Sequence, residues 1–144
     1  MIEQDTVRLL RECDAGVKMG IDSIDDVLSK VQSQPFYDAL TQCKNEHEAL
    51  QGEIQQLLGR YQDEGKDPNP MAKTMSKMKT NVKLMMDASD ATVADLMIDG
   101  CNMGVKSLNK YLNQYKAADE VSKDITKRLI HLEEKLTQDI RDYL

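Results

Sequence analysis

A six-residue motif occurs twice in this chain and constrains its fold more than any other feature. The first copy is Cys-Asp-Ala-Gly-Val-Lys at residues 13–18, and the second is Cys-Asn-Met-Gly-Val-Lys at residues 101–106. A weaker match of Leu, an acidic residue and Ile links residues 50–54 with residues 136–140. The two offsets, 88 and 86 residues, are nearly equal. We interpret the matches as the duplication of a helical hairpin, with small length changes at the turns.

Helical spacing of apolar residues predicts the first hairpin at about residues 5–63. Asp5 or Thr6 is expected to cap its first helix, in which apolar residues recur at three- and four-residue steps. Pro35 ends that helix and suits the first turn of the next one. The apolar stripe of the second helix is Phe36, Leu40, Cys43, Leu50, Ile54, Leu57 and Tyr61. Because the turn is short, the two helices must be antiparallel.

A crossover is expected at residues 64–88, which begin with a Gly- and Pro-rich break. Gly65 suits the C-terminal cap of the preceding helix, and a short amphipathic helix should follow. Five of the nine methionines lie between Met71 and Met86, together with four lysines. We expect a lid whose methionines cover one edge of the bundle while its lysines stay in water. The alternative is a binding helix for an acidic partner, a membrane surface or Cu(I).

The second hairpin is expected at about residues 89–144. Ser89 with Asp90 offers a cap for its first helix, and its second helix should begin after Asp119. The apolar stripes are Ala94, Ile98, Cys101, Val105, Leu108, Leu112 and Tyr115, then Ile125, Leu129, Leu132, Leu136, Ile140 and Tyr143. The predicted fold is therefore all-α. It is one domain of 144 residues, a four-helix bundle of two duplicated hairpins with a crossover helix.

Composition narrows the classes of partner and the compartment. The net charge of −6 and the lack of a basic arm argue against a nucleic-acid partner. Three cysteines without a short paired spacing fit a reducing compartment, so we expect a cytoplasmic protein. The polar N-terminus is unlike a signal peptide, and no apolar run approaches the roughly 18 residues of a membrane span.

The order of hairpin, crossover helix and hairpin is the topology of ferritin-like bundles, whereas simple up-and-down bundles have three short loops. With Glu-Cys-Asp-Ala-Gly at residues 12–16 and Glu-Ile-Gln-Gln-Leu at residues 53–57, the chain resembles an uncharacterised bacterial branch of the ferritin-like superfamily. That branch is distantly related to rubrerythrins. The resemblance covers nearly the whole chain and implies a ferritin-like bundle.

Di-iron enzymes of this superfamily use a carboxylate from one helix and Glu-x-x-His from its hairpin partner, because paired metal ions need bridging carboxylates and imidazoles. This chain lacks the complete set. Lys44 stands three residues before His47, and Arg128 stands three residues before His131. The second helix of the second hairpin has two adjacent glutamates, Glu133 and Glu134, instead of this motif.

Three carboxylates are nevertheless candidate ligands for iron or another transition metal. Counting residues from the hairpin turns at 1.5 Å per residue places Asp14 and Glu53 at similar heights in the bundle. Glu134 lies at the height of Asn102, which replaces Asp14 in the second motif. The candidate metal site is therefore Asp14, Glu53 and Glu134. The alternative is that these acids are solvated flank positions or polar spots inside the bundle.

Three further features of the sequence can each be interpreted in two ways. Cys13 and Cys101 occupy matching places, where thiols could act in redox chemistry or bind a soft metal, or could be small buried residues. His47 interrupts an apolar stripe and is either a hydrogen-bonded core or flank residue or a ligand. Glycines four residues apart, at 16 and 20 and at 100 and 104, form smooth patches that allow either close backbone packing within the bundle or a cofactor or dimer contact.

Three functions follow as hypotheses. The leading one is a non-enzymatic or catalytically degenerate ferritin-like protein acting through protein contacts, of which a homodimer is one form. The second is a metal-binding or redox protein that uses Asp14, Glu53 and Glu134 with help from Cys13 and Cys101. The third is a binding module that acts through the Met/Lys crossover.

Overall fold

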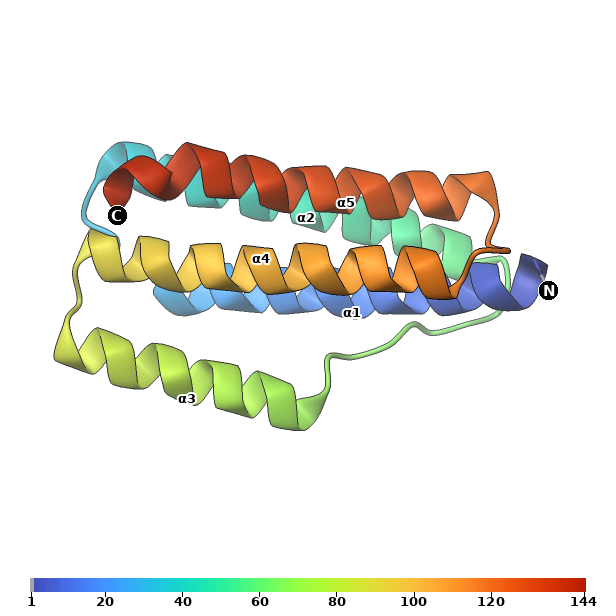
Figure 1. Cartoon of the computed structure of the whole chain (residues 1–144), viewed down its shortest axis with the longest axis horizontal. Coiled ribbons are helices and arrows are strands. Elements are labelled where there is room, and N and C mark those ends of the chain that lie inside the picture. The colour runs from blue at the N-terminus through green and yellow to red at the C-terminus, as the bar shows by residue number, and fades with distance from the viewer. Residues whose placement is uncertain (1) are drawn as a thin grey trace.

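The computed structural model describes residues 2–144, which form five α-helices and a final 3-10 turn (Figure 1). The elements are α1 (Ile2–Leu28), α2 (Gln34–Gly59), α3 (Pro70–Met86), α4 (Asp90–Gln114), α5 (Glu120–Ile140) and η1 (Arg141–Tyr143). Residues 2–144 contain no β-strand. The prediction of an all-α fold is confirmed.

Four long helices pack side by side, and α3 lies outside them along α1 and α4 (Figure 1). The helices α1 and α2 form one antiparallel hairpin, and α4 and α5 form another. Because α2 ends at one end of the bundle and α4 begins at the other, the crossover must run along the bundle (Figure 1). No helix within residues 2–144 has both the length and the apolar composition that crossing a bilayer requires.

Helix caps agree with the sequence at two places and differ at a third. The Ser89 hydroxyl accepts a hydrogen bond from the Thr92 amide at 3.2 Å, and the Asp119 carboxylate accepts one from the Ser122 amide at 2.8 Å. The prediction that Asp5 or Thr6 caps the first helix is wrong, since α1 already begins at Ile2.

Asp5 and Thr6 instead accept hydrogen bonds from the turn between α4 and α5. The Ala117 amide donates to the Asp5 carboxylate at 3.0 Å, and the Asp119 amide donates to the Thr6 hydroxyl at 2.8 Å. Side chains of the first hairpin therefore fix the turn of the second hairpin.

The bundle interior divides into two apolar clusters. Cluster I lies at the α1–α2 turn, and its buried members are Ile24, Val27, Phe36, Leu40, Cys43, Leu84, Val93, Ala94, Met97, Cys101, Leu136 and Ile140. Cluster II lies at the α4–α5 turn, and its buried members are Leu10, Cys13, Val17, Leu50, Ile54, Leu58, Leu108, Ile125, Leu129 and Ile130. Each cluster includes residues from all four long helices, so burial of these side chains holds the two hairpins together.

The loop after α2 is fixed to α1 by a buried carboxylate. Asp14 is fully buried, and its Oδ2 contacts Lys18 Nζ at 2.8 Å and accepts from the Lys66 amide at 3.0 Å. Arg11 adds a hydrogen bond to the Gly65 carbonyl at 2.9 Å. Gly65 is not the cap that the sequence predicts, because α2 ends at Gly59. It lies in this loop with a φ of 95°, directly over the Asp14 carboxylate.

We expect Gly65→Ala to lower the free energy of unfolding by about 1 to 3 kcal/mol. An alanine would have to adopt the left-handed backbone conformation of Gly65, and its Cβ would collide with the Asp14 carboxylate. Gly52→Ala is the matched control. Gly52 lies in α2 with open space around it, so alanine should raise stability by up to about 1 kcal/mol. Urea unfolding measures both changes. A Gly65→Ala protein as stable as the parent would contradict this role of the loop.

Candidate functional site

The three candidate metal ligands lie in different environments. Asp14 is buried and paired with Lys18, as described above. Glu53 is at the surface, where Arg128 donates to both of its oxygens at 3.1 and 2.8 Å and holds the pKa of Glu53 below its ordinary value. Glu134 is exposed. The His47 ring lies against Gly20, and Glu53 and Asp14 each stand six residues from that contact towards the same end of the bundle, so they are at similar heights. Asp14 nevertheless faces the crossover loop, whereas Glu53 faces α5.

The three carboxylates therefore do not make one ligand set. Within residues 2–144, no group of three or more His, Cys, Asp and Glu side chains is arranged to hold a metal ion. The residues present do not fit the di-iron centre that the family resemblance implies, and we assign none of them as a metal ligand.

The repeated cysteines are also separated. Cys13 belongs to cluster II, where its Sγ lies 3.1 Å from Thr126 Oγ1, whereas Cys101 belongs to cluster I with Cys43. Burial raises the pKa of all three thiols to about 12. Because the thiolate is the reactive form, these cysteines behave as small buried residues at neutral pH.

Two of the four glycines in the motif helices, Gly20 and Gly104, lie under a side chain and not under a second backbone, whereas Gly100 has no neighbour within 4 Å. The His47 ring lies over Gly20, with Nε2 at 2.8 Å from the place where a Cβ would stand. The carboxylate of Glu133 lies over Gly104 in the same way. The sequence predicts Glu134 as the candidate ligand, but Glu133 is the buried member of the pair. The four-three-four spacing of Leu129, Glu133, Leu136 and Ile140 was the signal that could have identified it.

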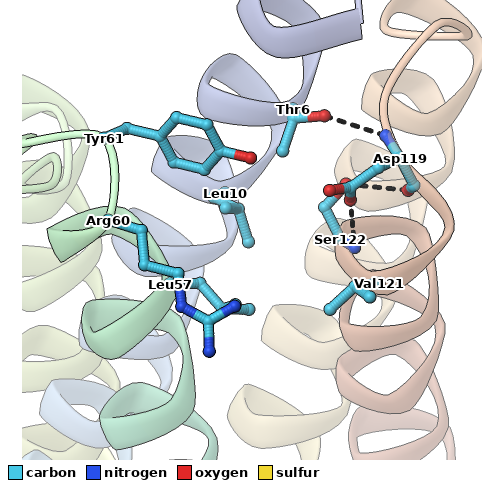
Figure 2. A pocket seen from close by; sticks show the side chains of 8 residues that line it. All are labelled: Thr6, Leu10, Leu57, Arg60, Tyr61, Asp119, Val121 and Ser122. Atoms are coloured by element: carbon cyan, nitrogen blue, oxygen red, sulfur yellow. Dashed lines mark hydrogen bonds between the residues drawn. The ribbon is translucent and has the colours of Figure 1, made fainter.

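Figure 2 shows a hollow at the end of the bundle, between the start of α1, the end of α2 and the start of α5. Its lining is Thr6, Leu10, Leu57, Arg60, Tyr61, Asp119, Val121 and Ser122. Its volume is about 60 Å³, and a second hollow between α2 and α5 measures about 80 Å³. Sites for small organic ligands usually measure about 300 to 1,000 Å³. Neither hollow has the size of a metabolite site.

The methionines of α3 form an exposed apolar face. The methionine face consists of Met71, Met75, Met78, Val82, Met85 and Met86, which are between 55% and 87% exposed. Leu84 is the buried residue of α3, and it joins cluster I from the opposite side of the helix. The prediction of a lid whose methionines cover the bundle is therefore wrong.

Lysines rather than methionines attach α3 to the bundle. Two of them reach α1, with Lys73 at 2.8 Å from Asp22 and Lys77 at 3.6 Å from Asp26. The other two reach α4, with Lys79 at 3.9 Å from Asp99 and Lys83 at 3.5 Å from Asp95. The Asp22 carboxylate also raises the pKa of Lys73. These four ion pairs direct the apolar side of α3 into solvent.

Comparison with known proteins adds no relative, since no family model, characterised protein or solved structure matches this chain.

Because the candidate carboxylates lie apart, we expect less than one iron, manganese, zinc or copper ion per chain in protein purified without chelators. Elemental analysis of the parent and of Glu53→Ala measures this. One equivalent of a metal in the parent that is lost in Glu53→Ala would contradict the expectation and would support the metal-binding alternative.

Proposed function

We propose that this chain works through protein contacts, and that the methionine face of α3 is its contact surface. The partner that we propose is the same face of a second copy, so that two α3 helices pair across a two-fold axis. The observation that supports the proposal is the outward direction of the methionines, which are exposed while the lysines of the same helix pair with the bundle.

Residue spacing supports a helix as the partner. Met71, Met75, Met78, Val82 and Met85 follow each other at steps of four, three, four and three residues. That is the spacing of the apolar seam of a coiled coil, in which each side chain fits between residues of a facing helix. A second copy carries the same seam, and a two-fold contact would cover both seams at once.

The flexibility of methionine suits such a contact. Its unbranched thioether side chain adapts to the shape of an apposed surface, and exposed apolar patches on soluble proteins commonly mark interaction sites. The side chains that flank the seam include Ala72, Thr74 and Asn81, which carry no charge, and Lys79, whose charge is paired with Asp99. Two copies can therefore approach at α3 although each has a net charge of −6.

The charges favour a protein partner over an anionic membrane. A membrane-surface helix uses lysines beside its apolar face to bind lipid headgroups. In α3 the four lysines already contact four aspartates, so their charges are neutralised locally. The overall negative charge also opposes approach to an anionic bilayer.

The proposal extends to the family and the compartment. A crossover that runs along the bundle between two hairpins supports a ferritin-like architecture, without the complete di-iron motif (Figure 1). Cys13, Cys43 and Cys101 are all free thiols, which supports a reducing, cytoplasmic location.

We expect the parent to form a reversible dimer between roughly 10 µM and 1 mM, because a seam of two heptads buries a small area. Sedimentation velocity over this range measures it. Met78→Glu should abolish the dimer by placing a charge in the seam. Met103→Glu is the matched control, since Met103 is 70% exposed on α4 and should leave the dimer unchanged. A parent that stays monomeric throughout, or a Met78→Glu variant that dimerises like the parent, would refute the proposal.

We further expect salt to loosen α3 but not the bundle, since screening weakens exposed ion pairs far more than apolar burial. In 1 M NaCl the amides of α3 should exchange with solvent faster, while those of α1 and α4 keep their rates. The variant Lys73→Ala with Lys77→Ala should give the same effect at low salt. Lys135→Ala, which breaks a pair within α5, is the control. Hydrogen exchange is measured by mass spectrometry on four samples: the parent at low salt, the parent in 1 M NaCl, the double lysine variant and Lys135→Ala. Equal protection of α3 in all four would contradict this expectation.

A further inference from the structure

One layer at the middle of the bundle belongs to neither apolar cluster. Along α2, cluster I ends at Cys43 and cluster II begins at Leu50, with His47 between them. Along α5, Glu133 separates the two clusters in the same way. The other two helices contribute Gly20 and Gly104, on which these side chains lie. A His, a Glu and two glycines thus form the layer between the clusters.

His47 and Glu133 stand at the same height on neighbouring antiparallel helices. The Glu53–Arg128 pair, with a contact of 2.8 Å, shows the register of α2 against α5. His47 stands six residues before Glu53 on α2, and Glu133 stands five residues after Arg128 on α5. Because the two helices are antiparallel, both steps lead towards the same end of the bundle. Both residues lie on the central apolar stripes of their helices. Their side chains therefore enter the same level of the interior.

The hydrogen bonding of His47 makes it an acceptor in this layer. Its side chain is 2% exposed, and Nδ1 lies 2.8 Å from the carbonyl oxygen of Cys43. A carbonyl oxygen only accepts, so Nδ1 carries the proton and Nε2 has a free lone pair. Burial lowers the pKa of His47, which keeps the ring neutral. Within residues 2–144, Nε2 is buried and has no hydrogen-bond partner.

Glu133 is the complementary donor. It is 8% exposed, and its Oε2 is likewise buried without a partner. Burial raises the pKa of Glu133 to about 8, so the side chain is a neutral carboxylic acid at pH 7. A protonated carboxylic acid carries one O–H donor, which is what the free lone pair of His47 lacks.

The other titratable groups described around the layer do not compete for this proton. From α2 these are Cys43 and Glu46, from α4 Cys101, and from α5 Lys135. The thiols keep their protons, as shown above, and Lys135 pairs with Asp139 at the surface. Glu46 is partly exposed. The helix α1 contributes Gly20 at this level, which has no side chain to titrate.

We propose that His47 and Glu133 form a buried proton-binding site, in which the carboxylic acid of Glu133 donates to His47 Nε2 through one water molecule, since the two side chains share no direct hydrogen bond. One proton satisfies both groups and leaves the layer uncharged. Loss of that proton from Oε2 to solvent leaves a buried carboxylate. Addition of a second proton at Nε2 leaves a buried imidazolium. Either charge opposes the packing of clusters I and II, so the site makes the bundle sensitive to pH.

The pH range follows from the two groups. Glu133 binds its proton more tightly in the folded state than in the unfolded state, so its contribution to stability falls as pH rises and is lost above about 8. The three buried thiols, whose pKa values are also raised, add a further loss only as pH rises through their ordinary value of 9. His47 binds its proton less tightly in the folded state, so stability falls as pH drops below its ordinary pKa of 6.5. Between about pH 6.5 and pH 8, Glu133 is the one group of the site whose ionisation changes stability, so the bundle should become steadily less stable as pH rises through this range.

The direct test is a titration of the parent by NMR, with ¹³C reporting the Glu133 carboxyl and ¹⁵N reporting the His47 ring. We expect the carboxyl to titrate near pH 8, and the Nε2 shift of His47 to change with the same midpoint. The ring of His131, which is exposed and lies outside this layer, is the internal control. A Glu133 that titrates near 4.5, or a His47 ring that does not respond to it, would overturn the proposal.

Variants give a second test by urea unfolding from pH 6 to 9. Glu133→Gln keeps the size of the side chain but removes its ionisation, so the loss of stability between about 6.5 and 8 should disappear. Glu134→Gln changes the exposed neighbour and should keep the loss. An unchanged pH dependence in Glu133→Gln would overturn the proposal, as would one equivalent of a metal ion that the parent binds and Glu133→Gln does not. If Glu133→Gln fails to fold, the titration of the parent decides.

Discussion

Ion pairs between α3 and the bundle determine what this molecule presents to its surroundings. Lysines on one side of α3 contact aspartates of α1 and α4, and only Leu84 of this helix is buried. The apolar side chains of α3 must then face away from the bundle. An amphipathic helix normally buries its apolar stripe and leaves its charges in water. Here the crossover has the reverse orientation, and the proposed function depends on that reversal.

The interior shows a related departure at its centre. Two clusters of apolar side chains hold the hairpins together, but the layer between them contains two ionisable groups. Gly20 and Gly104 make room for these groups because a Cβ at either position would collide with the imidazole or the carboxylate. Replacement of a buried polar pair by apolar residues is often neutral or stabilising. The polar character of this layer is therefore weak evidence for a stabilising role, and its two unpartnered ionisable groups make the surrounding packing depend on pH.

Much of the fold was predictable because it depends on local sequence patterns. The apolar spacing predicted the helices, and Ser89 and Asp119 marked two helix starts. The failures all involve partners distant in sequence. Asp5 and Thr6 cap a turn more than a hundred residues away, and Asp14 pairs with the crossover loop.

The candidate site was harder to predict than the fold. The orientation of α3 depends on Asp22, Asp26, Asp95 and Asp99, which belong to two other helices, and no pattern within α3 reveals them. The choice between Glu133 and Glu134 was within reach of the sequence, because only Glu133 continues the apolar stripe of α5. What the sequence could not indicate is that His47 and Glu133 meet at one level, since that depends on the register of α2 against α5.

Methionine oxidation tests the central claim most directly, because it reports which face of α3 meets water and whether a second copy covers it. Dilute protein treated briefly with hydrogen peroxide should oxidise Met75 and Met78 as fast as the exposed Met103, and much faster than the buried Met97. At concentrations where the dimer forms, the α3 methionines should become protected while Met103 stays reactive. Methionines of α3 that react as slowly as Met97 in dilute protein, or that gain no protection on concentration, would contradict the account.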